Sequence, residues 1–467
     1  MASTFFHRTM DRTTDSGYTK KWIFSAWIKI SSLGEIANKG LFSIQKGSTS
    51  NSRVNVGFDS SDKLWVETKD STGNDDAFKA TDMVFRDTNA WYHIYIKYDS
   101  TESTASDRLI IVVNGEAQTY NNVNEVSSNF GILMDSNVDW RLGIYRTNGG
   151  AIRYFDGIMS HVHFSEFNDS DTPTPYTAFG STDSTTGEWK INTAPSVTYG
   201  SQGLFVLKDN NLGTDQSGQS NNLSASGTCT KTEDCPSNVF CTINPLSNKI
   251  NFSLANGNTT LNDNGSDDND NGIAATMGVN SGKYYWEMKK GSGSGGVHAV
   301  ITDDVDVRLG NRATSSPDSN LWGFQSNGTG APLVSYIAGT FDSSGNALQG
   351  WGANDIIGFA LDMDNGKLYV SINGTFKGLN NNTSDPANAT NPAITGIPTG
   401  GKFIIPYFEK RSADSPETMC NFGNGYFGTT AVSSNSGNGY SASGSLGVFQ
   451  YQPPSGYTAL CTKGLNE

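Results

Sequence analysis

Short runs of β-branched and aromatic residues alternate with polar turn clusters along most of the chain. Residues 22–30 (WIFSAWIKI) carry apolar side chains at every second position, which places Trp22, Phe24, Ala26, Ile28 and Ile30 on one face of an extended chain. Residues 91–98 (WYHIYIKY) have the same period, with aromatic side chains on both faces. No helical period lasts three turns, so the pattern predicts an all-β protein with little helix.

Turn signals separate the predicted strands. The pair Asn114 and Gly115 follows an apolar run at 108–113, and both residue types tolerate positive φ, so a hairpin is predicted there. Asn373 and Gly374 give a second such signal, and residues 362–366 (DMDNG) give a third. Strands are therefore predicted on either side of each of these turns, at 108–113, 355–361 and 367–372 among others.

Changes in composition divide the chain into four segments. A first β module is predicted over residues 1–167, and a second over 249–430. Between them, 168–248 is polar but holds isolated strand-like pieces at 188–190 and 203–207, so it is predicted to be a connector that packs on its neighbours. Residues 431–467 are rich in Gly and Ser and predict an extended strap that Pro residues confine to an edge. The expected fold class is two tandem antiparallel β-sandwiches of jelly-roll type joined by a partly ordered connector.

Composition and charge limit the classes of partner that the protein is expected to bind. With 32 Lys and Arg against 46 Asp and Glu, the formal charge is −14, which argues against nucleic acid or an anionic membrane surface as a partner. The longest apolar runs have five or six residues, at 109–113 and 356–361, so no membrane-spanning segment is predicted. The first residues lack the basic and apolar stretches of a secretion signal. The protein is expected to be made in a cytoplasm without a cleaved secretion signal.

Five cysteines without a CxxC pair favour free thiols and argue against zinc. Cys229 and Cys235 are near enough in sequence to close a small loop, and this alternative stays open.

Calcium is the one metal with a sequence signal. Residues 267–272 (DDNDNG) resemble the opening half of an EF-hand loop, with oxygen ligands at alternate positions before a glycine. Asp267, Asn269 and Asn271, together with Asp263, form a candidate calcium loop, although the closing Glu is absent and Gly278 stands at its position. The alternative is a solvated acidic loop. No other cofactor is expected.

No catalytic constellation is predicted. Glycoside hydrolysis needs two facing carboxylates, yet Glu166 and Glu67 each stand alone on their predicted strands. His161 and His163 lie two apart on one strand but lack a third metal ligand, so they are interpreted as polar positions on a solvent-facing strand. There is no nucleophile elbow or P-loop. Catalytic residues are therefore expected to be absent.

The first module resembles the laminin-G-like domains of the concanavalin A type. The resemblance spans about 150 residues and rests on five blocks, at 24–28 (FSAWI), 85–87 (FRD), 91–94 (WYHI), 109–115 (LIIVVNG) and 154–157 (YFDG). It implies a jelly-roll sandwich in which any calcium would lie at rim loops, where Asp87 or Asp156 would contribute.

The second module looks like a SPRY domain, through 282–287 (GKYYWE), 355–362 (DIIGFALD) and 368–374 (LYVSING). SPRY domains bind peptides or proteins through loops at one end of the sandwich. The resemblance therefore implies binding loops at 308–320 and 341–351.

The two modules in this order, with 187–189 (GEW), 213–215 (GTD), 240–245 (FCTINP) and 453–462 (PPSGYTALCT), resemble virion proteins of tailed bacteriophages, notably marine ones. The resemblance implies a tail fibre, appendage, knob or capsid decoration on the outer surface of the virion. Other virion subunits are then the expected partners, and a homo-oligomer, such as a trimer, is plausible.

Aromatic residues leave the function open between three hypotheses. Nine Trp, 18 Tyr and 24 Phe exceed what a Gly-rich core needs, and sugars stack on aromatic faces, although Trp27, Trp91, Trp286 and Trp322 are predicted to be core residues. The first hypothesis is a virion surface protein that binds a host-surface glycan or protein through loops. The second is a purely structural decoration or joining protein without a host ligand. The third is a polysaccharide depolymerase, which the lack of paired carboxylates disfavours.

Overall fold

The structure is a computed structural model of the 467-residue chain. It describes residues 4–10, 20–34, 39–46, 52–69, 75–131, 138–146, 152–208, 211–247, 252–263, 272–291, 296–305, 320–325, 334–337, 340–342, 348, 350–409, 417–432 and 440–466. Two compact units are present, Met1–Lys231 and Thr232–Glu467. The division lies inside the segment 168–248, so most of that segment packs as part of unit 1.

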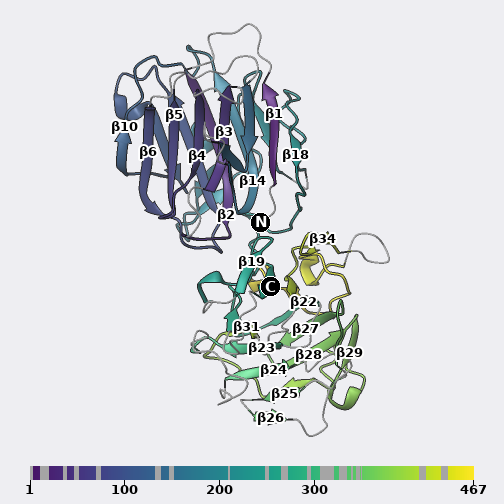
Figure 1. The fold of residues 1–467 in the computed structure, drawn as a ribbon. Coiled ribbons are helices and arrows are strands. Elements are labelled where there is room, and N and C mark those ends of the chain that lie inside the picture. The colour runs from purple at the N-terminus through teal and green to yellow at the C-terminus, as the bar shows by residue number, and fades with distance from the viewer. Residues whose placement is uncertain are drawn as a thin grey trace. The chain divides into compact units, whose positions relative to one another are not determined.

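Unit 1 is a sandwich of two antiparallel sheets (Figure 1). Among the described residues, the larger sheet has eight strands in the order β10 (Tyr120–Asn124), β6 (Asp75–Val84), β5 (Lys63–Lys69), β4 (Arg53–Phe58), β3 (Lys39–Lys46), β11 (Val138–Leu142), β1 (Phe5–Met10) and β18 (Ser224–Ser226). The smaller sheet, over the same ranges, has the order β17 (Leu204–Val206), β14 (Gly157–Phe167), β2 (Lys21–Ile30), β7 (Tyr92–Asp99), β8 (Leu109–Val113) and β9 (Glu116–Ala117).

The core of unit 1 lies between these sheets. Strand β2 contributes the five side chains that the period of two predicts, Trp22, Phe24, Ala26, Ile28 and Ile30, and all of them are buried in one cluster. Strand β7 pairs with β2 and adds Tyr92, Ile94, Ile96 and Tyr98. Burial of each large apolar side chain stabilises the folded state by roughly 2 kcal/mol, so this cluster is the main source of stability of unit 1.

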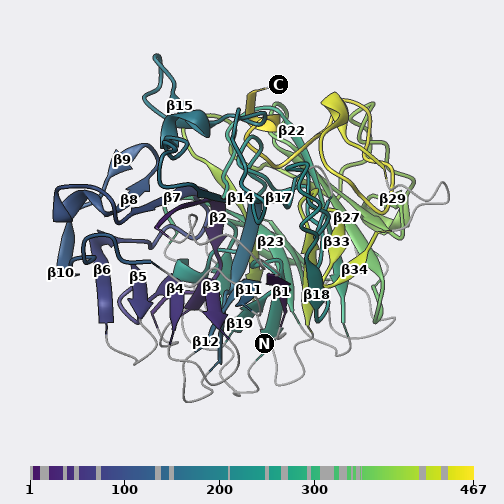
Figure 2. The ribbon, with the colours of Figure 1, turned by 90° about the horizontal axis from the view of Figure 1, so that it is seen from above.

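A third layer covers the outer face of the smaller sheet. It includes the short helix η3 (Tyr176–Ala178) and the hairpin of β15 (Gly180–Thr182) with β16 (Trp189–Ile191). Ile23, Tyr95 and Val112 point outward from the sheet and form a second apolar cluster with Phe167 and Phe179. In Figure 2, β15 and its surrounding chain lie on the side of β7 and β2 that faces away from β3, β4 and β5. A smaller hairpin, β12 (Ile144–Arg146) with β13 (Ile152–Tyr154), contacts β3.

Unit 2 is also a sandwich. One sheet, in the part of the chain described, has β19 (Phe252–Ala255), β20 (Thr260–Asp263), β32 (Thr418–Asn421), β22 (Lys283–Lys290), β27 (Ile356–Asp362), β28 (Lys367–Ile372) and β29 (Thr375–Lys377), with β30 (Ile394–Thr395) on β28 and β35 (Thr458–Ala459) on β22. The other has β21 (Gly272–Ala274), β31 (Ile404–Glu409), β23 (Val297–Thr302), β24 (Leu321–Gln325), β25 (Val334–Ile337) and β26 (Thr340–Asp342).

The remaining regular elements are short. They are the hairpin of β33 (Tyr426–Phe427) with β34 (Thr430–Ala431) and the single turns η2 (Ala105–Asp107), η4 (Pro245–Ser247), η6 (Leu379–Asn381), η7 (Ser443–Ser445) and η8 (Gly464–Asn466). Every described helix is of the 3₁₀ type, which confirms the all-β prediction. None of the described elements is a helix long and apolar enough to cross a membrane.

The predicted turns and strands are largely confirmed. Asn114 and Gly115 have φ of 48° and 81° between β8 and β9, and Asn373 and Gly374 have 49° and 81° between β28 and β29. The prediction missed β1, β3 and β23, among other strands.

In unit 2 the C-terminal segment 440–461 forms the strap. Phe449 and Tyr457 pack with Tyr285, Tyr369 and other side chains in a cluster separate from the main core. The carboxylate of Glu287 on β22 holds this strap, because its oxygens accept the backbone N–H groups of Gln450 and Tyr451, each at 2.8 Å. The Asn421 amide and the Tyr285 hydroxyl donate to the same carboxylate, each at 3.2 Å.

Burial raises the pKa of Glu287 to about 7, although the four donors oppose this shift. A carboxyl whose folded-state pKa is raised is penalised in its charged form. Its contribution to the free energy of unfolding therefore falls as the pH rises from about 4.5 through 7.

We expect the substitution Glu287→Gln to loosen the strap, because an amide NH₂ would replace one of the two accepting oxygens. Hydrogen exchange at the amides of Gln450 and Tyr451 should accelerate by roughly ten- to hundred-fold, as befits the loss of a charged hydrogen bond. Exchange measured by mass spectrometry tests this. The matched control is Glu116→Gln, on the exposed strand β9, and equal exchange in both variants would contradict the role of Glu287.

Candidate functional site

The candidate site is a pocket of about 560 Å³ on the outer face of the smaller sheet of unit 1. Its floor comes from β7, β2 and β8, whose outward side chains include Tyr95, Lys97 and Asp99 at alternate positions of β7. The loop at 99–102 and the segment 171–176 form its walls. We call it the Tyr95 pocket, and its volume is in the range of small-ligand sites.

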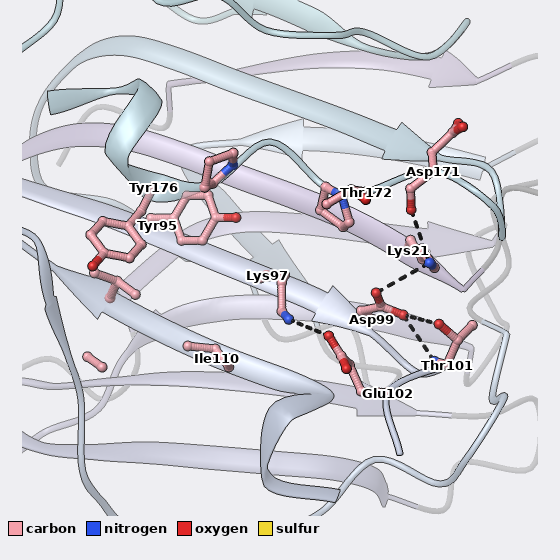
Figure 3. A pocket seen from close by; sticks show the side chains of 14 residues that line it. Lys21, Tyr95, Lys97, Asp99, Thr101, Glu102, Ile110, Asp171, Thr172 and Tyr176 are labelled. Atoms are coloured by element: carbon pink, nitrogen blue, oxygen red, sulfur yellow. Dashed lines mark hydrogen bonds and ion pairs between the residues drawn. The ribbon is translucent and has the colours of Figure 1, made fainter. Parts of the chain in front are cut away.

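The two ends of the Tyr95 pocket differ in character. Figure 3 shows Tyr95 and Tyr176 together at one end, and Asp99, Thr101, Glu102 and Lys21 at the other, with Lys97 between them. The two tyrosine rings meet edge to face, with centroids 6.1 Å apart. The pocket therefore offers an apolar end and a hydrogen-bonding end.

Two ion pairs line the polar end. Lys21 Nζ lies 3.5 Å from Asp99 Oδ2, and Lys97 Nζ lies 3.0 Å from Glu102 Oε1. The other oxygen of Asp99 accepts the N–H and hydroxyl of Thr101, at 3.0 and 2.6 Å. Asp99 is thus fully engaged by its neighbours, whereas Lys97 and Glu102 are bonded chiefly to each other.

The wall at 171–176 is tied to the sheet at two points. Lys21 Nζ donates to the carbonyl of Asp171 at 3.1 Å, and Tyr95 Oη donates to the carbonyl of Thr174 at 2.8 Å. Pro173 and Pro175 fix φ within this short segment. The wall is therefore held in place before any ligand binds.

Beside the pocket, His93, His163 and Phe205 of the sheet pack with Phe179 and Trp189 of the third layer to form an aromatic layer. The indole N–H of Trp189 donates to His93 Nδ1 at 3.1 Å, so the imidazole proton must lie on Nε2, which faces Ser25 Oγ at 2.9 Å. The indole of Trp189 also packs against the turn between β8 and β9, since a Cβ at Gly115 would come within 2.5 Å of the indole ring. Burial lowers the pKa of His93 to about 3.

The prediction that His161 and His163 face solvent is wrong. Both side chains are buried on β14, with exposed fractions of 8% and 2%. His163 stacks on Phe205 with centroids 3.9 Å apart and bonds Tyr199 Oη at 2.7 Å. Burial holds the pKa of His163 well below its ordinary value. The covering residues come from the segment that the sequence indicated only as a connector.

The candidate calcium loop lies largely outside the described residues. Asp263 ends β20 and Gly272 begins β21, while Asp267, Asn269 and Asn271 fall between them. Binding loops predicted at 308–320 and 341–351 are likewise mostly outside. Within the described ranges, no three His, Cys, Asp or Glu side chains are grouped so as to hold a metal ion. Cys229 and Cys235 are free.

The acidic residues considered for hydrolysis are engaged by neighbours. Glu67 lies 3.0 Å from Arg53 and 3.5 Å from Lys69, and Glu166 accepts the N–H of Gln202 at 2.7 Å. Trp27, Trp91, Trp286 and Trp322 are buried, as predicted. The sequence did not single out Lys97, Glu102 or Tyr176. The period of β7 placed Lys97 beside Tyr95, but nothing local indicated the wall at 171–176.

Comparison with known families agrees with the fold of unit 1. Residues 9–172 match a laminin-G-type family described as the concanavalin A-like lectin/glucanases superfamily. The match lies within unit 1 and includes all the strands that line the Tyr95 pocket. No curated protein matches the chain in sequence.

SPRY domains are among the structural neighbours of the chain. The PSpry domain of TRIM65 has 17% identity and a TM-score of 0.27, and covers 39% of this chain and 91% of its own. The SPRY domain of human HERC1 has 15% identity and a TM-score of 0.28, and covers 38% of this chain and 96% of its own.

We expect acid to destabilise unit 1 through His93. A base whose folded-state pKa is lowered to about 3 binds its proton more readily when unfolded, so stability is lost as the pH falls from about 6.5 towards 3. Every tenfold difference in proton affinity between the folded and unfolded states corresponds to about 1.4 kcal/mol. The measurement is the urea midpoint of the tryptophan fluorescence transition between pH 7 and 5.

His93→Gln should reduce this pH dependence, and the remainder should come from His163, whose pKa is also held low by burial. Phe179→Leu, in the same aromatic layer but without a titratable group, should lower stability by a similar amount at each pH. An unchanged slope in His93→Gln would show that His93 is not the group responsible.

Proposed function

We propose that this protein is a non-enzymatic surface component of a tailed-bacteriophage virion, a tail fibre, appendage, knob or capsid decoration. In this proposal it docks to other virion subunits and binds a host-surface glycan or protein. The observation that supports binding most strongly is the Tyr95 pocket, in a unit whose larger part matches a lectin-containing superfamily.

The binding role is favoured over catalysis by the state of the pocket carboxylates. Hydrolysis of a glycoside needs one carboxylic acid and one carboxylate placed across the scissile bond. Asp99 and Glu102 are instead each paired with a lysine, and Asp99 has both oxygens occupied. Carboxylates that are already bonded to lysines of the protein suit recognition of a ligand better than hydrolysis.

The placement on a virion rests on the sequence resemblance described above. Rigid sandwiches suit an exposed attachment role, because loops and covering segments vary without loss of the core. Synthesis in the host cytoplasm is consistent with Cys229 and Cys235, which form no disulfide in the structure.

Adsorption of the purified, fluorescently labelled protein to candidate bacterial hosts tests this proposal. We expect saturable binding restricted to particular strains, competed by unlabelled protein. A repeat with chelator tests the calcium loop, since loss of binding would implicate Asp267, Asn269 and Asn271.

The control is the same protein after denaturation, which should bind no strain selectively. Absence of saturable binding to any host would contradict attachment and leave the second hypothesis, a decoration or joining protein. A reducing-sugar assay on surface polysaccharide should give no product. Release of reducing ends would contradict the proposal that the protein is not an enzyme.

A further inference from the structure

We infer that the Tyr95 pocket takes a neutral saccharide unit, with one ring face on Tyr176 and adjacent hydroxyls bound by Lys97 and Glu102. The inference rests on the proposed function and narrows its ligand from a host-surface glycan or protein to an uncharged sugar. Three features of the pocket support it: the division into two ends, the hydrogen-bonding capacity left unused, and the charge balance.

The apolar end fits one face of a pyranose ring. Tyr176 is half-buried beside Tyr95, and Ile110 and Pro175 also line the pocket. The hydroxyl of Tyr95 is already occupied by the carbonyl of Thr174, so Tyr95 supplies floor and not a polar contact. The aliphatic C–H face of a sugar gains from an aromatic platform, as other amphipathic groups do.

The polar end fits a pair of adjacent hydroxyls. An ammonium group has three donors, and Lys97 Nζ has one partner, Glu102 Oε1, in the part of the chain that the structure describes. Glu102 keeps a second oxygen and is more exposed than Asp99. Lys97 can therefore donate to one sugar oxygen while Glu102 accepts from the neighbouring hydroxyl. Asp99 and Lys21 instead support the walls.

The charge balance disfavours an acidic ligand. Lys21 and Lys97 contribute two positive charges, and Asp99, Glu102 and Asp171 three negative ones, which leaves the lining at −1. A carboxylate or sulfate on the ligand would be repelled by this net negative charge and would compete with Glu102 for Lys97. Each lysine of the lining is already paired with a carboxylate, and the described lining contains no arginine, so an acidic sugar would find no unpaired positive charge.

The experiment is a glycan array that carries neutral and acidic glycans, followed by saturation-transfer NMR with the neutral glycans bound. We expect selective binding of neutral glycans. Tyr176→Ala and Lys97→Met should each weaken it by roughly ten-fold or more, because each removes a direct contact. Tyr176→Phe keeps the ring and should bind within about two-fold of the unaltered protein.

Lys190→Met is the matched control for Lys97→Met. Lys190 also forms an ion pair, with Asp183 at 2.7 Å, but it lies outside the pocket and is half exposed. This variant should bind the glycan normally. A loss equal to that of Lys97→Met would show that the effect is not local and would overturn the inference.

Three results distinguish failure of this inference from failure of the proposed function. If the protein adsorbs to host cells but Tyr176→Ala and Lys97→Met adsorb equally well, the pocket is not the attachment site and the inference fails alone. If acidic glycans bind in place of neutral ones, the ligand class is wrong. If neither glycans nor cells are bound, both the inference and the attachment role fail.

Discussion

The central constraint on this structure is that its inner strands are buried on both faces. All ten residues of β2 are buried, yet a sandwich of two sheets buries only the faces that meet. The outward side chains, such as Ile23 and Trp27, need a further layer to exclude water. In unit 1 that layer is the chain around β15 and β16, and in unit 2 the corresponding cover for Tyr285 and Tyr369 is the strap at 440–461.

Covering a sheet with irregular chain forces polar groups into dry surroundings. His93 and Glu287 show the two chemical responses. Burial lowers the pKa of His93 and raises that of Glu287, so in each case it favours the neutral form. Each group also anchors its covering segment, through the indole of Trp189 and the amides of Gln450 and Tyr451. The same residues that attach the third layer therefore make its stability depend on pH.

This dependence on distant chain explains what sequence reasoning could reach. Period-two alternation located β2 and β7, and turn signals located β8, β27 and β28, because both kinds of signal lie within the strand or at its ends. The exposure of His161 and His163 was misjudged because Phe205 and Tyr199, which cover His163, approach from about forty residues further along. The Tyr95 pocket was missed for the same reason, since Lys21, Asp99 and the 171–176 wall meet only in the fold.

The pocket lies where the covering layer of unit 1 comes to an end. Along the outer face of β7, His93 is covered by Trp189 and Tyr95 is bonded to Thr174, whereas Lys97 and Asp99 line the pocket. A site at such a boundary has a rigid floor from the sheet and a wall fixed by hydrogen bonds. Ligand binding therefore needs little further ordering of the protein, which lowers its entropy cost. Its chemistry is set by a few side chains at the end of the layer, which can vary while the apolar core that positions them stays the same.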